Sequence, residues 1–414
     1  MVLPALLLMT GAAPAETLVT APFLEQHPPV IQQNPGELLE AHASARNLAA
    51  DFEAIFRQHI HDEGILGAAF VVATPLGVVH AGAAGHTDTS RGQTIDENTP
   101  FRIASVSKTF AAGLTGLLVR DGWMRWDDPL IRYLPDFRIN GDAGKVQLSH
   151  LLGQSTGLMP HAYDNLIEDG LPVERILPHF SKLSYLCTPG LCYSYQNSLF
   201  SLIEPVIEQV TARTYGDLME ERIFQPLNMH TASVGFEPFV NDPKHAKPHV
   251  RGRGRWITVP VQPNYYRVAP AAGVNASALD MGKWLQAQMG GAPAIIDSDL
   301  IRTLTQPRVK TIREMRRKHW RGMLSEAHYG LGWRVYQLGE HRIAYHSGWV
   351  SGYRADLAWS QELGIGVAVL MNVESNTISQ LTTTFWEMVF ASAAPPAVAG
   401  VHRTGPGANA PFAP

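Results

Sequence analysis

The sequence predicts an α/β (α+β) fold in which strands from both ends of the chain form one antiparallel sheet around an inserted helical region. Two short Val- and Ala-rich runs lie in residues 67–85, and four more strand-like runs follow residue 329. Between them, residues 101–324 consist of helical patterns joined by Pro- and Gly-rich loops. Strands at both ends of a helical middle favour a single sheet that is completed by distant parts of the chain.

The N-terminal elements have the clearest local signals. Residues 37–64 carry an apolar helical pattern that ends at Gly64, and a glycine in this position is typical of a helix stop. Residues 67–85 consist of two apolar runs separated by a Thr-Pro-Leu-Gly segment. This pattern predicts two strands joined by a turn.

The middle of the chain reads as helices. Residues 101–122 form an amphipathic pattern that carries Ser105 and Lys108 at its start. A second helix has Ser277 and Asp280 as its start signal and two glycines after it. No convincing run of strands occurs in this region, so we expect it to be all-helical.

The C-terminal part returns to strands before a final helix at residues 377–391 and a Pro/Gly/Ala-rich end. We therefore expect two domains and a disordered tail. The expected parts are a discontinuous α/β domain (37–100 plus 325–392), a helical domain (101–324) and the tail (393–414).

The N-terminus predicts export. An apolar run from Leu3 to Met9 precedes Ala13-Pro14-Ala15, which suits signal peptidase, although a positively charged start is missing. We interpret residues 1–15 as a signal peptide and expect a periplasmic or extracellular protein; the alternative is an apolar N-terminus without a targeting role. No later run reaches the roughly 18 apolar residues that a membrane span needs.

Composition excludes some functions. The 414 residues carry a net charge of -4, with 45% hydrophobic and 17% charged residues. The chain therefore lacks the excess of positive charge that would indicate nucleic-acid binding. Basic residues gather between Arg313 and Arg321. They predict a solvated surface, and the alternative is a surface for an anionic polymer. The 17 histidines are scattered, and we expect neither a metal nor a cofactor.

Two cysteines, Cys187 and Cys192, flank a Pro-Gly turn. They are too few for a four-ligand zinc site, and the turn could bring them within disulfide range. We expect a disulfide, with two buried free thiols as the alternative.

Ser105 and Lys108 form a Ser-x-x-Lys pattern at a helix start. Residues i and i+3 share one helix face, so the lysine can reach the serine. A desolvated, neutral lysine could accept the serine proton, and free N–H groups at the helix start could stabilise developing negative charge. The pattern alone is weak, because it occurs by chance in chains of this length.

Two further segments carry polar side chains. Tyr195 and Asn197 follow the cysteine pair, and His346 and Gly348 end a predicted strand. Each of these residues alone is more typical of a structural role. Tyr195 could relay a proton if neighbouring cations lower its pKa, and a glycine on a strand lets a substrate backbone approach closely.

The order of these three motifs resembles the serine β-lactamase and D,D-peptidase superfamily, over residues 52–372. The likeness is to its class C branch, which includes D,D-carboxypeptidases and family VIII esterases. It implies a β-lactamase/transpeptidase-like fold. It also implies that Ser105 is the nucleophile, Lys108 its proton acceptor and Tyr195 the general base and acid, with the backbone N–H groups of Ser105 and Trp349 as the oxyanion hole.

The resemblance assigns substrate binding to Asn197, His346, Ser347 and Gly348. Three residues depart from the usual pattern. His346 replaces a lysine, so no fixed positive charge is assured for a substrate carboxylate. Gln196 replaces a serine, and Trp349 places a large apolar side chain at the mouth of the site.

The sequence thus predicts an exported serine hydrolase that acts through an acyl-serine on an amide or ester, like a β-lactamase or D,D-carboxypeptidase. The substrate would be a β-lactam, a D-Ala-D-Ala peptide or an ester. The alternative is a family VIII-type carboxylesterase, and a penicillin-binding sensor that does not turn over is less favoured. The oligomeric state stays open.

Overall fold

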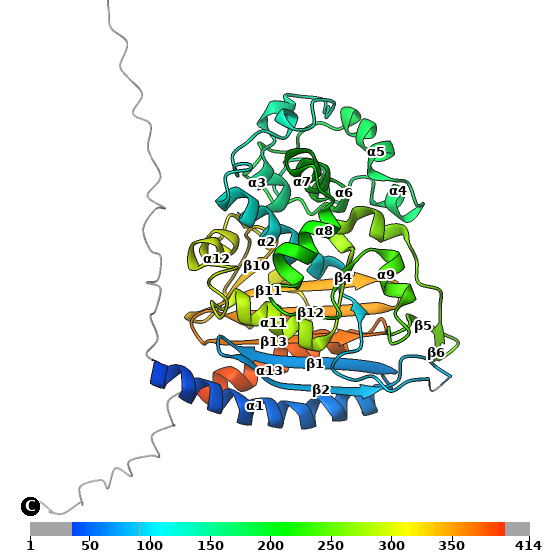
Figure 1. Cartoon of the computed structure of the whole chain (residues 1–414), viewed down its shortest axis with the longest axis vertical. Helices are drawn as coiled ribbons and strands as arrows, with labels where there is room; N and C mark the ends of the chain where they lie inside the picture. The colour runs from blue at the N-terminus through cyan, green and yellow to red at the C-terminus, as the bar shows by residue number, and fades with distance from the viewer. Residues whose placement is uncertain (1–34, 91, 394–414) are drawn as a thin grey trace, which may run out of the picture. The chain divides into compact units, whose positions relative to one another are not determined.

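The computed structural model describes residues 35–90 and 92–393. Its main element is an eight-stranded sheet in the order β2-β1-β13-β12-β11-β10-β9-β8 (Figure 1), in which every neighbouring pair is antiparallel. The strands are β1 (Gly67–Thr74), β2 (Gly77–Gly85), β8 (Val309–Lys310), β9 (Glu326–Tyr329), β10 (Arg334–Leu338), β11 (His341–Val350), β12 (Tyr353–Ser360) and β13 (Ile365–Met371).

The two ends of the chain meet inside this sheet. Strand β1 pairs with β13, with Ala68 opposite Met371 and Ala73 opposite Gly366. The prediction that distant parts of the chain complete one antiparallel sheet is therefore confirmed. The short strands β8 and β9 were not expected, because two to four residues are too few to show an alternating pattern.

Strand β1 is buried on both faces, and its side chains divide between two apolar clusters. Phe70 packs on one face against Phe52 of α1 (Pro35–Asp62), with ring centroids 5.2 Å apart. On the other face, Val71 belongs to a cluster that includes Trp284 of α11 (Ala278–Gln288). The final helix α13 (Thr377–Ala393) lies beside α1 on the first face (Figure 1). Helices therefore cover both faces of the sheet.

The second face of the sheet carries most of residues 101–305. The longer helices here are α2 (Ser107–Arg120), α7 (Ile203–Thr211), α11 and α12 (Ser298–Thr305). The shorter ones are α3 (Leu148–Leu152), α4 (Asp164–Glu168), α5 (Val173–Ile176), α6 (Asn197–Phe200), α8 (Tyr215–Met219), α9 (Phe236–Asn241) and α10 (Ala269–Ala272). The predicted start of α11 is confirmed, because Ser277 and Asp280 form a reciprocal capping box.

Two expectations for this region were wrong. It is not all-helical, since β3 (Phe101–Arg102), β7 (Val274–Ala276) and β4 (Ser233–Val234) form a small sheet. A hairpin of β5 (His249–Gly252) and β6 (Arg255–Thr258) adds a third sheet. Partners far along the chain impose the short strands of the small sheet. Moreover, α2 begins at Ser107 rather than near Phe101, and it is buried on nearly every side instead of along one stripe.

Three expectations stay predictions. The signal peptide at residues 1–15 lies outside the described residues, as does the expected tail at 393–414 apart from residue 393, which ends the final helix. The division into an α/β domain and a helical domain is untested, since the second apolar cluster joins side chains of both parts. Within the described chain, no helix is long and apolar enough to cross a membrane.

Candidate active site

Ser105 lies in the one-turn 3-10 segment η1 (Ala104–Val106), which leads directly into α2. Ala104 has a φ of +48°, a left-handed conformation that residues other than glycine rarely adopt. Such backbone conformations gather at functional sites, where the surrounding structure holds them in place. The turn presents Ser105 just before the start of α2, where backbone N–H groups have no partner within the helix.

Lys108 is completely buried beneath Ser105. Its Nζ atom lies 3.3 Å from Oγ of Ser105, 2.8 Å from Oδ1 of Asn197 and 3.0 Å from the carbonyl oxygen of Ala271. Burial, helped by the charge of Arg334, holds the pKa of Lys108 well below its usual value. The side chain is therefore placed to act as a neutral amine beside the serine hydroxyl.

Tyr195 comes from the extended segment just before α6. The Ser105 side chain lies close enough to its hydroxyl to oppose the rise of its pKa, and Nζ of Lys108 lies 4.7 Å from its ring centroid. Burial raises the pKa of Tyr195 above its usual value, and the nearby Arg334 only partly opposes this effect. The expected lowering of this pKa by neighbouring cations is thus not found, and the phenol keeps its proton at neutral pH.

Residues 346–350 of β11 run along the turn that carries Ser105. Strand β10 pairs with β11 only as far as Arg334 opposite Tyr345, so among the described residues no strand pairs with this part of β11 on that side. A Cβ atom at Gly348 would lie 2.1 Å from the carbonyl oxygen of Ile103. Only glycine allows the strand to pass this close to the backbone before Ser105. The role of the Trp349 N–H as an oxyanion donor stays a prediction.

The side chain of His346, the first residue of this segment, is completely buried. Its Nδ1 donates to the carbonyl oxygen of Ser347 (2.9 Å), which leaves Nε2 to accept from the hydroxyl of Tyr329 (3.1 Å). Burial and the nearby Arg334 and Lys108 hold the pKa of His346 well below its usual value. The imidazole is therefore neutral at physiological pH.

A cavity of about 1020 Å³ opens at Ser105. The sequence-predicted residues that line it are Ser105, Tyr195, Asn197, Ser347 and Trp349. Lys108, His346 and Gly348 are not among the lining residues. The assignment of His346 to substrate binding stays a prediction, since the structure places its ring below the cavity floor. The indole of Trp349 is 59% exposed at the cavity rim.

Charged side chains surround this cavity. Cations come from β3, β8, β10, β12 and residues 313 and 317, and carboxylates come from α4 and from residues 314 and 374. The cations are Arg102, Lys310, Arg313, Arg317, Arg334 and Arg354, and the carboxylates are Asp164, Glu168, Glu314 and Glu374. Within the described residues, no cluster of three or more His, Cys, Asp or Glu side chains could hold a metal ion.

Sequence reasoning missed Arg334 and Asp164. Arg334 is buried, pairs with Glu314 (2.8 Å) and donates to the hydroxyl of Tyr193 (3.1 Å), and its guanidinium carbon lies 5.6 Å from the ring centroid of Tyr195. An arginine inside a predicted core strand was a usable signal, because charged residues are seldom buried without a partner. Asp164 follows a polar loop and offers no comparable sequence signal.

In the structure, Cys187 and Cys192 form a disulfide with their Cα atoms 6.4 Å apart. The loop that they close precedes Tyr193 and Tyr195, and the N–H of Gly190 within it donates to the carbonyl of Ser155 (2.7 Å). The bridge therefore restrains the segment that carries Tyr195.

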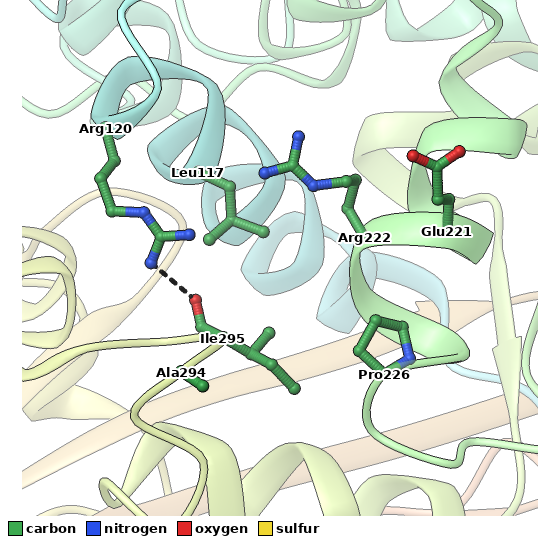
Figure 2. A pocket seen from close by; sticks show the side chains of 7 residues that line it. All are labelled: Leu117, Arg120, Glu221, Arg222, Pro226, Ala294 and Ile295. Carbon is green, nitrogen blue, oxygen red and sulfur yellow. Dashed lines mark hydrogen bonds between the residues drawn. The ribbon is translucent and has the colours of Figure 1, made fainter.

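A second, smaller cavity of about 180 Å³ lies at the other end of α2 (Figure 2). Arg120 there donates to the carbonyl oxygen of Ile295 (3.0 Å), and Arg222 pairs with Asp121. Its arginines are thus already engaged, and none of the motif residues lines it. The chemistry is therefore assigned to the larger cavity.

Two curated hydrolases are similar to this chain in sequence. The chain is similar to the esterase EstB of Burkholderia gladioli, with 29% identity over 211 residues that cover 47% of this chain and 54% of that protein. It is also similar to a β-lactamase of Escherichia coli strain K12, with 25% identity over 251 residues that cover 61% of each. The chain spans between half and two thirds of the length of the curated relatives it matches.

A solved structure shares the fold. The octameric penicillin-binding protein homologue from Pyrococcus abyssi superposes with a TM-score of 0.72 and 22% identity, over 83% of this chain and 77% of that one. Residues 52–384 also match the family model described as Beta-lactamase. The match covers most of the chain, including β11 and the turn that carries Ser105. The chain therefore belongs to the β-lactamase family.

Proposed function

We propose that this protein is a serine hydrolase that cleaves an amide or ester through an acyl-serine intermediate, in the manner of a β-lactamase or D,D-carboxypeptidase. The observation that carries the proposal is the 3.3 Å approach of the Lys108 amine to Ser105 at the end of a large cavity. A neutral amine in this position is a base of the kind that activates a serine nucleophile.

In acylation, Lys108 accepts the Ser105 proton while Oγ attacks the substrate carbonyl carbon. The backbone N–H groups of Ser105 and Trp349 donate to the oxyanion that forms. Tyr195 donates its proton to the leaving nitrogen or oxygen as that bond breaks, and Lys108 then returns its proton to Tyr195. The products are the acyl-serine and the protonated leaving group.

In deacylation, water attacks the acyl-serine carbonyl and gives one proton to Lys108. The carbonyl carbon then loses Oγ of Ser105, which takes that proton back. The amine and the phenol end in the protonation states in which they began, so the cycle is balanced. Both half-reactions use the same oxyanion donors.

The charges of the cavity support an amide substrate that carries a carboxylate. Neutral His346 supplies no positive charge, but Arg334 and Arg313 line the cavity, and a guanidinium can bind a carboxylate through two hydrogen bonds. A β-lactam and a D-Ala-D-Ala peptide both have such a group.

A carboxylesterase of the family VIII type is the second candidate. The exposed indole of Trp349 and the exposed side chain of Ile312 both line the cavity. They provide an apolar surface that suits an uncharged acyl or alcohol group. Export is also part of the proposal, and the Cys187–Cys192 disulfide supports it because such bonds persist in oxidising compartments.

The test compares the wild type with Ser105→Ala on a chromogenic cephalosporin, a D-Ala-D-Ala peptide and a short p-nitrophenyl ester. Mass spectrometry then measures the acyl-enzyme. The wild type should hydrolyse at least one substrate, and Ser105→Ala should neither hydrolyse nor be labelled while keeping its fold. Labelling of another serine would overturn the assignment. A stable acyl-enzyme without turnover would indicate a penicillin-binding sensor instead.

A further inference from the structure

A chain of polar contacts leads from Asp164, the first residue of α4, to the nucleophile. The side-chain amide nitrogen of Asn197 donates to Oδ2 of Asp164 (3.0 Å). The amide oxygen of Asn197 accepts from Nζ of Lys108 (2.8 Å), which in turn lies 3.3 Å from Oγ of Ser105. Asp164 is therefore two side chains away from the serine.

The carboxylate determines which way the amide of Asn197 points. An ionised carboxylate only accepts hydrogen bonds, so the NH₂ group of Asn197 must face Asp164. The amide oxygen then faces Lys108. Without Asp164, the amide could rotate and present its NH₂ group to the lysine, where two donors would meet.

The orientation of Asn197 in turn determines where the lysine lone pair lies. A neutral amine has two N–H donors and one lone pair. The amide oxygen of Asn197 and the carbonyl oxygen of Ala271 (3.0 Å) are both acceptors and take the two N–H groups. Ser105 is the third neighbour, so the lone pair faces its hydroxyl.

We propose that Asp164 is a positioning residue that, through Asn197, directs the lone pair of Lys108 toward Ser105. This inference rests on the proposed serine hydrolase function. It extends the site beyond the three sequence motifs, to a residue in none of them.

The surroundings of Asp164 keep its carboxylate in place. Nδ1 of His161 lies 2.9 Å from the same Oδ2 atom, and the backbone N–H of Asp164 donates to the carbonyl of His161 (3.2 Å). The N–H of His161 donates to the carbonyl of Tyr195 (2.8 Å). The negative charge of Asp164 acts to raise the pKa of Lys108, Tyr195 and Tyr265. The carboxylate is thus tied to the segment that carries the other catalytic groups.

The experiment measures acylation of Ser105 by p-nitrophenyl acetate as a single-turnover burst between pH 5 and 9. Asp164→Ala loses the acceptor for Asn197, and its acylation rate on the alkaline plateau should fall on the order of 100-fold. Asp164→Asn keeps an acceptor oxygen, so its acylation rate should fall by a smaller factor. Its acidic limb should also move to lower pH, because a negative charge that favours protonated Lys108 is gone. The exposed neighbour Asp169→Asn is the matched control.

A double-mutant cycle tests whether Asp164 acts through Asn197. Adding Asp164→Ala to Asn197→Ala should lower the acylation rate by a much smaller factor than Asp164→Ala does in the wild type. Full additivity, or wild-type acylation in Asp164→Ala, would overturn the inference. Thermal unfolding checks the fold, and Asp164→Asn with its pH profile carries the test if Asp164→Ala does not fold.

A fluorophosphonate probe separates this inference from the proposed function. If wild-type Ser105 is not labelled, the proposed function fails. If the wild type is labelled and Asp164→Ala is labelled at the same rate, only the role of Asp164 fails.

Discussion

The amine of Lys108 lies 3.3 Å from the hydroxyl of Ser105, and the lysine side chain is completely buried. A lysine in water is protonated at neutral pH and cannot accept a proton. Desolvation penalises the charged form, so burial converts a common surface residue into a base. The buried Arg334 favours the same neutral form, and Asp164 opposes it.

Lys108 should set the acidic limb of the pH profile. Activity needs the neutral amine, so kcat/KM should rise with pH and reach its plateau well below pH 10.5, since the pKa is lowered. Lys108→Ala should lower kcat/KM by about 10² to 10⁴-fold. Lys108→Arg should be equally impaired because a guanidinium keeps its proton. Steady-state kinetics across pH checks this, and the exposed Lys182→Ala should match the wild type.

Arg334→Met should shift the acidic limb of the pH profile in the direction opposite to the shift expected for Asp164→Asn. The positive charge of Arg334 lowers the pKa of Lys108, so its loss should shift the acidic limb to higher pH. The variant also leaves the buried Glu314 with Arg317 (3.2 Å) as its remaining charged partner, which should reduce the free energy of unfolding by roughly 1–3 kcal/mol. Denaturant unfolding and pH-rate profiles measure both effects. An unshifted limb in a folded variant would contradict this account, and Arg316→Met at the exposed surface is the control.

His346 should contribute no inflection to the pH profile between pH 6 and 8. Its pKa is held well below 6.5, so the imidazole is neutral throughout that range. His346→Gln should keep the shape of the profile. His346→Lys should lower the temperature of unfolding, because it places an ammonium group beside Lys108 and Arg334. A wild-type inflection near pH 6.5 that disappears in His346→Gln would show that the ring titrates.

Asp356 should make stability depend on pH. The side chain is buried on β12 and accepts from the hydroxyls of Tyr345 (3.2 Å) and Thr382 (2.9 Å). Burial raises its pKa from 3.8 to about 6. The folded state therefore binds the proton more tightly than the unfolded chain, and this contribution to stability is lost as the pH rises through 6.

Asp356→Asn should remove that dependence. Relative to the variant, the wild type should lose roughly 3 kcal/mol of unfolding free energy between pH 4 and pH 8, at 1.36 kcal/mol per pKa unit. Denaturant titrations at the two pH values measure the difference. Parallel pH dependences in the two proteins would show that Asp356 does not titrate in this range.

Loss of the disulfide should affect stability more than catalysis. The loop from Cys187 to Cys192 is short, and its closure accounts for about 2 kcal/mol of chain entropy. The N–H groups of Leu186 and Gly190 remain bonded to the carbonyls of Gly157 and Ser155 (2.7 Å each). The double variant Cys187→Ser/Cys192→Ser should thus unfold at lower denaturant and acylate at close to the wild-type rate. A large loss of acylation in the folded variant would instead give the bridge a direct role in placing Tyr195.

Several parts of the fold could be predicted because their signals are local. The hairpin of β1 and β2 follows from two apolar runs around a Thr-Pro-Leu-Gly turn, and α11 follows from the capping pair Ser277 and Asp280. Strands β3 and β8 could not be found this way. Each has only two residues, and pairing with another strand, β7 for β3 and β9 for β8, holds it in place.

Ser105 and Lys108 are one helical turn apart, so their proximity could be inferred from four consecutive residues. The neutral state of the lysine could not, since desolvation depends on every atom around it, including those of Ala271 and Arg334. The raised pKa of Tyr195 was missed for the same reason, because burial outweighs a nearby cation. Local spacing thus predicted that Ser105 and Lys108 lie together, and the protonation states of these groups and the link to Asp164 depend on packing between distant segments.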